Sequence, residues 1–162
     1  MNTKTALPKE AQRIQDLLRE LGSSAEVLEF PEGTRTVAEA AASIGVDEGQ
    51  IAKSLVFMCG DEAVLVVASG RYRVDMNKLR AVLGQPVRQA KPAEVKEKTG
   101  LPIGGVSPIG QKHPMRVLLE TRLWDYPVVY AAAGTPSTAF ATTGDELLAL
   151  TKGERVDVAE VK

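Results

Sequence analysis

Apolar residues recur at helical spacing near the start of the chain. Ile14, Leu17, Leu18 and Leu21 fall on one face of a helix that Pro8 can open and Gly22 can end. Similar patterns, bounded by capping residues and glycines, predict four further helices. They are Val37–Ser43 behind a Thr36 cap, Met76–Leu83 behind Asp75, a helix from Pro92 to Gly100, and Asp145–Leu150.

Two apolar runs, Ile51–Met58 and Ala63–Ala68, flank a Gly60-Asp61 turn and predict a β-hairpin. Further strands are predicted over Glu26–Phe30, Arg116–Glu120, Val128–Ala132 and Thr138–Thr142, with a short one near Val156. Because strands come in pairs as well as singly between helices, the pattern favours an α+β fold. Its sheet should be mixed and mainly antiparallel, with helices packed around it.

The length of 162 residues suits one domain, 1–162, and three Phe, three Tyr and one Trp leave the core to aliphatic side chains. The N-terminus lacks the apolar core of a signal peptide, and no apolar run is long enough to span a bilayer. Cys59 is the only cysteine, which suits a reducing compartment. We therefore expect a cytoplasmic protein that does not bind membranes.

Positive charge is concentrated in the middle of the chain. The net charge is −1, but residues 71–116 hold ten Lys and Arg against three Asp and Glu. Such a stretch can bind a phosphate backbone locally, or it can be a solvated face without a partner. Charge alone favours the second interpretation.

Lys53 is the first candidate for chemistry. In an extended Ile51–Met58 it shares a face with Ile51, Leu55 and Phe57. An ammonium among apolar neighbours is costly unless it reaches water or meets an anion. Two interpretations follow: a lysine that extends to solvent, or a cation on a pocket floor that binds phosphate or carboxylate.

Two Gly/Pro loops are the other candidates. The segment Gly104-Gly105-Val106-Ser107-Pro108-Ile109-Gly110 fixes an unusual backbone path that can bring N–H groups against a ligand, although it could also be a tight turn. It lacks the Gly-Lys-Ser/Thr of a phosphate-binding P-loop. The segment Ala133–Thr138 follows an apolar strand and carries small and hydroxyl residues, which suits a small polar-lined site.

The remaining reactive residues predict no metal, no cofactor and no nucleophilic triad. His113 is the only histidine and lies in a basic loop, and no motif surrounds Cys59. Asp145 and Glu146 are typical acids of a first helical turn. No cluster of carboxylates indicates a magnesium site.

Together, Lys53 in Ile51–Phe57, the loop Gly104–Lys112 and Gly134 before the last helix resemble the YbaK/EbsC family. This family comprises stand-alone relatives of the editing domain inserted in bacterial prolyl-tRNA synthetase. The resemblance runs from about Ile14 to Leu150 in matching order and spacing. It implies a sheet curled into a partly open barrel, with helices outside.

The resemblance also implies a function and its residues. The function is hydrolysis of the ester of a mischarged aminoacyl-tRNA, above all tRNA-Pro carrying a small amino acid such as Ala or Cys. The implied partners are the acceptor end of the tRNA and prolyl-tRNA synthetase, and we expect a monomer or weak homodimer. The implied catalytic residues are Lys53, Gly104, Gly105 and Ser107, and the implied substrate-binding residues are Phe30, Pro108, Gly134, Thr135 and Thr138.

Three positions differ from other members of the family. Phe30 and Thr138 replace a tyrosine and an aspartate of the member that names the family, and Gln111 stands where other branches have a histidine. These differences leave a second hypothesis, a non-catalytic module that binds aminoacyl-tRNA or aminoacyl-adenosine. A serine esterase is disfavoured, because the chain has no G-x-S-x-G elbow and one histidine.

Overall fold

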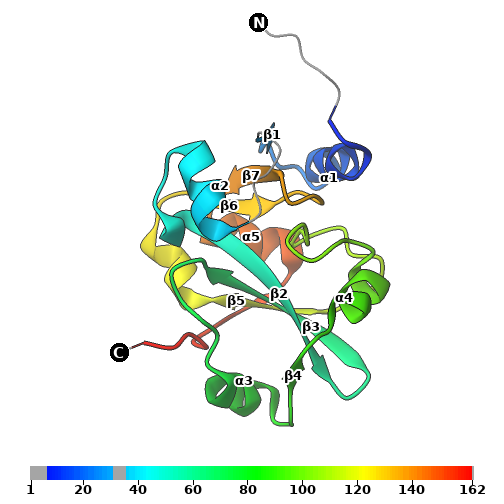
Figure 1. Ribbon diagram of the computed structural model, residues 1–162, viewed down its shortest axis with the longest axis vertical. Coiled ribbons are helices and arrows are strands. Elements are labelled where there is room, and N and C mark those ends of the chain that lie inside the picture. Colours follow the sequence, from blue (N-terminus) through cyan, green and yellow to red (C-terminus); the bar gives the residue numbers. More distant parts are fainter. Residues whose placement is uncertain (1–6, 31–35, 162) are drawn as a thin grey trace, which may run out of the picture.

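The structure is a computed structural model, and it describes residues 7–30 and 36–161. Within these residues, five α-helices surround a sheet (Figure 1). They are α1 (Lys9–Glu20), α2 (Val37–Ile44), α3 (Met76–Leu83), α4 (Pro92–Thr99) and α5 (Gly144–Thr151), with short 3₁₀ helices η1 (Glu48–Gln50) and η2 (Thr121–Asp125). None of the helices in the described residues is long and apolar enough to cross a membrane.

The described part of the chain contains eight strands, which form one sheet. They are β1 (Val27–Glu29), β2 (Ile51–Cys59), β3 (Glu62–Ser69), β4 (Arg88–Gln89), β5 (Arg116–Glu120), β6 (Val129–Ala132), β7 (Thr138–Thr142) and β8 (Glu154–Val156). Their order is β1-β7-β6-β2-β3-β5-β8, with β4 paired to β2. The predicted mixed, mainly antiparallel sheet is confirmed, and it stays open because β1 and β8 end it without pairing to each other.

The β2–β3 hairpin is the longest ladder of the sheet and is confirmed as predicted. Its register runs from Ala52↔Ser69 to Cys59↔Glu62, around a Gly60 with φ of 61°. Both faces of the hairpin are covered. Val56 and Leu65 belong to the core cluster beneath α1 and α4, whereas Phe57 and Val66 belong to a second cluster beneath α3. This double burial explains why the strands are continuous apolar runs.

The helix boundaries follow the capping signals in the sequence. Thr36 and Glu39 form a reciprocal capping box at the start of α2. The Asp75 side chain accepts hydrogen bonds from the first turn of α3. Gly84 and Gly100 adopt the left-handed conformation directly after α3 and α4, where a side chain would be strained. The predicted helix ends are therefore confirmed to within about two residues.

Two elements escaped the sequence analysis. The two residues of β4 carry no strand pattern and pair only because the chain passes beside Phe57 and Met58. The η1 turn is capped by Asp47 immediately before β2. Both elements have two or three residues, too few for hydrophobic periodicity to reveal them.

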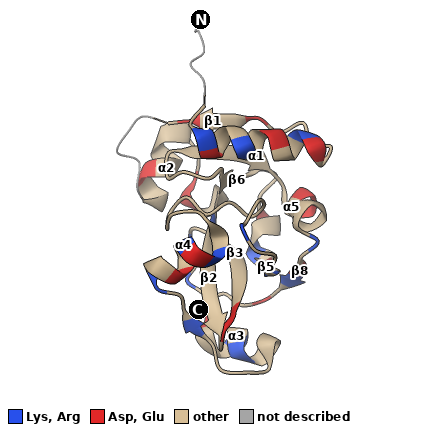
Figure 2. Cartoon of the chain, turned by 90° about the vertical axis from the view of Figure 1, so that its right-hand side faces the viewer, with Lys and Arg blue, Asp and Glu red and all other residues tan. Residues whose placement is uncertain are grey.

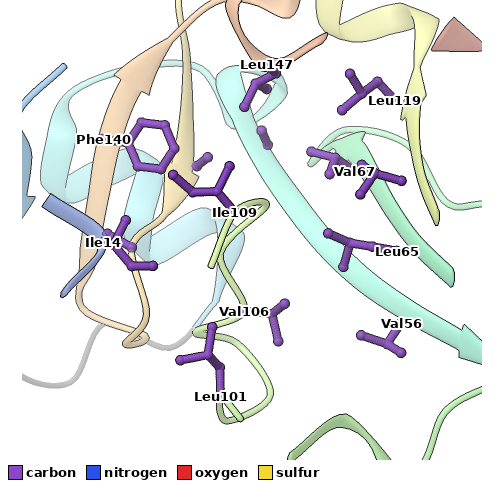
Figure 3. Packing of buried hydrophobic residues seen from close by; sticks show 14 of the residues in the cluster. Ile14, Val56, Leu65, Val67, Leu101, Val106, Ile109, Leu119, Phe140 and Leu147 are labelled. Atoms are coloured by element: carbon purple, nitrogen blue, oxygen red, sulfur yellow. The ribbon is translucent and has the colours of Figure 1, made fainter. Parts of the chain in front are cut away.

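The loop between α4 and β5 lies against the sheet. Leu101, Val106 and Ile109 are buried, and Figure 3 shows Ile109 between Phe140 of β7 and strand β2. The apolar residues of the loop therefore anchor it in the main core. Of its glycines, Gly104 is exposed, Gly105 lies against the backbone of Thr135, and Gly110 lies against side chains of α1.

Candidate functional site

One edge of β2 is only partly paired. On this edge β6 pairs with Ile51 and Ala52, and β4 pairs with Phe57 and Met58. Among the described residues no strand pairs with the stretch between them on this edge, although β3 pairs with its other edge throughout. The sheet is thus split beside Lys53, Ser54 and Leu55.

A cavity of about 230 Å³ opens over this split. Its β2 wall is Ile51–Leu55, and the end of β6 contributes Tyr130 and Ala132. Helix α2 closes the cavity on one side with Val37 and Ala40. The first Gly/Pro loop and the residue before it bound another side with Ile103, Gly104 and Val106. The walls are mainly apolar, so a charged group inside is poorly solvated.

Lys53 supplies the charge in this cavity. Its side chain is half-buried, and it forms no hydrogen bond or ion pair with the residues that the structure describes. Burial lowers the pKa of the Lys53 ammonium below its ordinary value of 10.5, and the neighbouring positive charge of Arg73 lowers it further. A cation held without a partner in an apolar wall is suited to binding an anionic group.

The first Gly/Pro loop divides into a part that lines the cavity and a part that holds the loop. Gly104 lines the cavity with φ of 86°. Gly105 N–H donates to Pro102 O at 2.9 Å, and a Cβ on Gly105 would lie 2.8 Å from the Cα of Thr135. Ser107 and Pro108 are buried behind the cavity, and Ser107 Oγ accepts from the Ile109 N–H at 3.3 Å.

The second loop is arranged in the same way. Thr138 is buried and lines the cavity, and its hydroxyl lies 2.8 Å from the Thr135 hydroxyl. Gly134 has φ of 98°, and a Cβ there would lie 3.1 Å from the Glu10 carbonyl of α1. Thr135 and Gly134 therefore hold the loop between the first loop and α1, behind the cavity wall.

Four of the predicted site residues thus meet at one cavity: Phe30, Lys53, Gly104 and Thr138. The other five predicted residues do not line this cavity but support the two loops: Gly105, Ser107, Pro108, Gly134 and Thr135. Phe30 is tied to the second loop, since its N–H donates to Ser137 O at 2.8 Å. Sequence reasoning missed Tyr130, Ile103, Ser54 and the α2 side chains as members of the site. They come from separate segments that meet only in the folded chain, and Tyr130 is placed there by the pairing of β6 with β2.

The other reactive residues lie elsewhere. A second cavity of about 430 Å³ at the turn of the hairpin is lined by Cys59, Glu62 and His113, among others. Burial raises the pKa of the Cys59 thiol, which disfavours the reactive thiolate. The described residues contain no group of three His, Cys, Asp or Glu that could hold a metal ion.

Four of the ten basic residues in the stretch 71–116 form ion pairs within the molecule. Arg71 pairs with Asp47, Lys78 with Asp157, Arg88 with Glu94 and Arg116 with Glu154. Figure 2 shows both signs of charge on α4 as well as on α1. Lys96 and Lys98 of α4 and the nearby Lys112 form no ion pair with the described residues. Three basic residues that are available to a partner therefore lie around the end of α4.

The fold and site define a class: an open mixed sheet with a small, mainly apolar, lysine-bearing pocket between two glycine loops. The chain belongs to the aminoacyl-tRNA editing domain family, whose profile matches residues 31–150. The family predicted from Lys53 and the two loops is thereby confirmed.

Individual relatives agree with this assignment. The chain is 41% identical over 123 residues to the uncharacterized protein YwhH of Bacillus subtilis strain 168, covering 75% of this chain and 78% of YwhH. It is 40% identical over 77 residues to the proline–tRNA ligase of Thermosipho melanesiensis, which is 47% of this chain but 14% of the ligase. A crystal structure described as that of a proposed trans-editing enzyme for prolyl-tRNA synthetase superposes with a TM-score of 0.92 at 44% identity, covering 96% of this chain and 100% of that one.

Proposed function

We propose that this protein hydrolyses the ester bond of mischarged aminoacyl-tRNA, with tRNA-Pro carrying a small non-cognate amino acid such as Ala or Cys as its substrate. The observation that carries the proposal is the single unpaired ammonium of Lys53 in the small apolar cavity between the two loops. Membership of the editing-domain family and the likeness to proline–tRNA ligases supply the class of substrate.

The proposed roles follow from where the residues lie. Lys53 binds the terminal phosphate or ribose of the acceptor end, because its charge lacks another partner among the described residues. Gly104 offers its N–H to the oxyanion that develops on the ester carbonyl, since it has no side chain and lines the cavity. Phe30 and Thr138 border the amino-acid side chain, and Gly105, Ser107, Pro108, Gly134 and Thr135 keep the loops in place.

Modest catalytic power is enough for this reaction. An aminoacyl ester is an activated bond, so positioning a water molecule and stabilising the oxyanion can accelerate its hydrolysis without a nucleophilic triad. The ribose hydroxyl or the α-amine of the substrate can assist the proton transfer. In this mechanism Lys53 positions the substrate, and it is not a general base.

The test is deacylation of a panel of mischarged tRNAs by the wild type and by Lys53→Ala. We expect hydrolysis of tRNA-Pro carrying a small amino acid, and a loss of at least about tenfold in kcat/KM in the variant. A wild type inactive on every tRNA of the panel would contradict the enzymatic function. If it nevertheless binds a non-hydrolysable aminoacyl-adenosine, the non-catalytic binding module is the correct alternative.

A further inference from the structure

The main-chain N–H and C=O of Ser54 point toward the unpaired edge of β2. Gly70 N–H donates to Ile51 O, so odd-numbered residues of β2 bond with the β3 side. Ala90 N–H donates to Val56 O, so even-numbered residues bond with the opposite edge. The N–H and C=O of Ser54 therefore point to the edge where neither β6 nor β4 pairs with it.

The Ser54 side chain is unpaired as well. Among the residues that the structure describes, its Oγ is the one buried side-chain oxygen or nitrogen without a hydrogen-bond partner. An unsatisfied buried hydroxyl is unfavourable and is rare in folded proteins. With respect to residues 7–30 and 36–161, Ser54 thus combines an unpaired N–H, an unpaired C=O and an unpaired hydroxyl at the wall of the cavity.

The cavity reaches the side of β2 on which this hydroxyl lies. Side chains alternate along the strand, so Ser54 shares the face of Ala52 and Val56, opposite Lys53. Ala52 lines the cavity together with Val106, which packs in the core with Ala52 and Val56. The cavity therefore passes around the open edge of the strand, and a ligand there can reach Ser54 while it also meets Lys53.

We infer that this open edge binds the aminoacyl group of the substrate as one residue of an added strand. The α-ammonium donates to Ser54 C=O, and the ester carbonyl accepts from Ser54 N–H, which is the pairing that a neighbouring strand would make. The Ser54 hydroxyl rotates about χ1 to supply a further hydrogen bond to the bound group. This inference rests on the proposed function. It assigns to the main chain of Ser54 the recognition of the α-amino and carbonyl groups that all aminoacyl esters share, whatever their side chain.

Amide hydrogen exchange tests the inference on the intact wild-type protein. The ligand is a non-hydrolysable amide, 3′-alanylamino-3′-deoxyadenosine. We expect saturation with it to slow exchange of Ser54 N–H by about tenfold or more. Leu55 N–H is the internal control, because it already pairs with β3 and should change little. Binding of the ligand without protection of Ser54 N–H would overturn the inference.

Two comparisons separate this inference from the proposed function. The 3′-propanoylamino analogue lacks only the α-amine, and we expect it to bind at least about tenfold more weakly. Ser54→Pro removes the N–H without breaking the β3 ladder, so its kcat/KM should fall at least about tenfold below that of Ser54→Ala. Equal binding of the two analogues, or equal activity of the two folded variants, would refute the inference while the wild type still deacylates tRNA. A wild type that neither binds nor deacylates would instead refute the proposed function.

Discussion

Lys53 illustrates a conflict between stability and binding at a single residue. Its ammonium is half-buried in an apolar wall and has no partner among the described residues, so folding removes water from it without replacing the lost interactions. In the proposed function, this partly desolvated charge binds an anionic group of the substrate. Part of this desolvation cost is recovered when an anion binds, because the ammonium has already lost some of its water in the folded protein.

We predict that Lys53→Met stabilises the protein and abolishes the proposed activity. Met keeps a similar length without the charge, so the melting temperature should rise by about 2 °C. Differential scanning calorimetry and deacylation assays on the same preparations measure the two effects. Lys53→Arg, which keeps a charge, is the matched control and should not be more stable than the wild type. A fall in melting temperature for Lys53→Met would contradict this account.

The pKa shift of Lys53 predicts how stability depends on pH. Because the folded-state pKa lies below the ordinary value of 10.5, the unfolded chain binds more protons between the two values. The free energy of unfolding contributed by this residue therefore rises as pH increases through that window. Urea unfolding of the wild type and Lys53→Met at several alkaline pH values should show their difference shrinking as pH rises. If the difference in free energy of unfolding between the two proteins grew with pH, the lowered pKa of Lys53 would be excluded.

At the scale of elements, the two loops form one unit. Gly105 lies directly against the backbone of Thr135, and Gly134 lies against the backbone of α1. The cavity wall is therefore set by a stack of loop, loop and helix. Gly104 and Thr138 occupy their places at the cavity because the residues beside them have no room to shift.

Gly105→Ala should disturb this stack. The new Cβ would lie 2.8 Å from backbone atoms of Thr135, which cannot rotate away, so we predict a loss of about 1–3 kcal/mol in the free energy of unfolding. The cavity should widen, and kcat/KM should fall even when the variant is fully folded. Urea denaturation and deacylation measure the two effects.

Gly84→Ala is the control for that variant. Gly84 has φ of 71° but nothing within 4 Å of an added Cβ, so it tests backbone strain without a steric clash. It should cost about 1 kcal/mol and leave activity unchanged. If Gly105→Ala kept full activity and stability, the two loops would not be in the contact described.

At the scale of the whole molecule, Glu120 ties the C-terminal segment to the sheet. This carboxylate is fully buried at the end of β5. It accepts hydrogen bonds from Arg122 and, at 3.0 Å, from the Val158 N–H. Asp157 then joins Arg122 and Lys78 on the surface. The network closes the second core, to which Val158 and α3 contribute.

Glu120→Ala should destabilise the protein by about 3 kcal/mol. The substitution leaves Arg122 and the Val158 N–H without their buried acceptor. Chemical denaturation measures the loss, and Asp157→Ala, which removes an exposed partner of the same arginine, should cost below about 1 kcal/mol. Deacylation per folded molecule should be unchanged in both. Equal losses in the two variants would show that burial of Glu120 does not decide its contribution.

The charge distribution of the whole molecule leads to a prediction about tRNA. Lys96 and Lys112 lie near the end of α4 without ion pairs to described residues, whereas Arg71, Lys78, Arg88 and Arg116 are neutralised. Reversal of both charges, Lys96→Glu with Lys112→Glu, should weaken tRNA binding about tenfold or more and reduce its dependence on salt. Lys9→Glu, a charge reversal on α1 away from this surface, is the control and should change tRNA binding less. Filter binding at several salt concentrations measures both effects, and an unchanged salt slope would exclude this surface.

Much of the architecture is encoded locally. The β2–β3 hairpin, the Thr36–Glu39 capping box and the glycine ends of α3 and α4 depend on residues close together in the chain, so periodicity and capping chemistry predicted them. The order of Lys53 and the two glycine loops also predicted the family, which the profile match confirms. These features need no knowledge of how distant segments meet.

The site itself depended on the tertiary structure. The open edge at Ser54 exists because β6 stops pairing with β2 before β4 begins to pair with it. The tertiary structure also decides which loop residues line the cavity, which ones support it, and that Tyr130 and α2 contribute to it. Likewise, ion pairing across the fold decided which basic residues remain available. These are long-range pairings, and local patterns carry no information about register between segments far apart in sequence. The sequence by itself therefore determined most of the elements and the family and made Lys53 a candidate, whereas only the tertiary structure decided what surrounds that lysine.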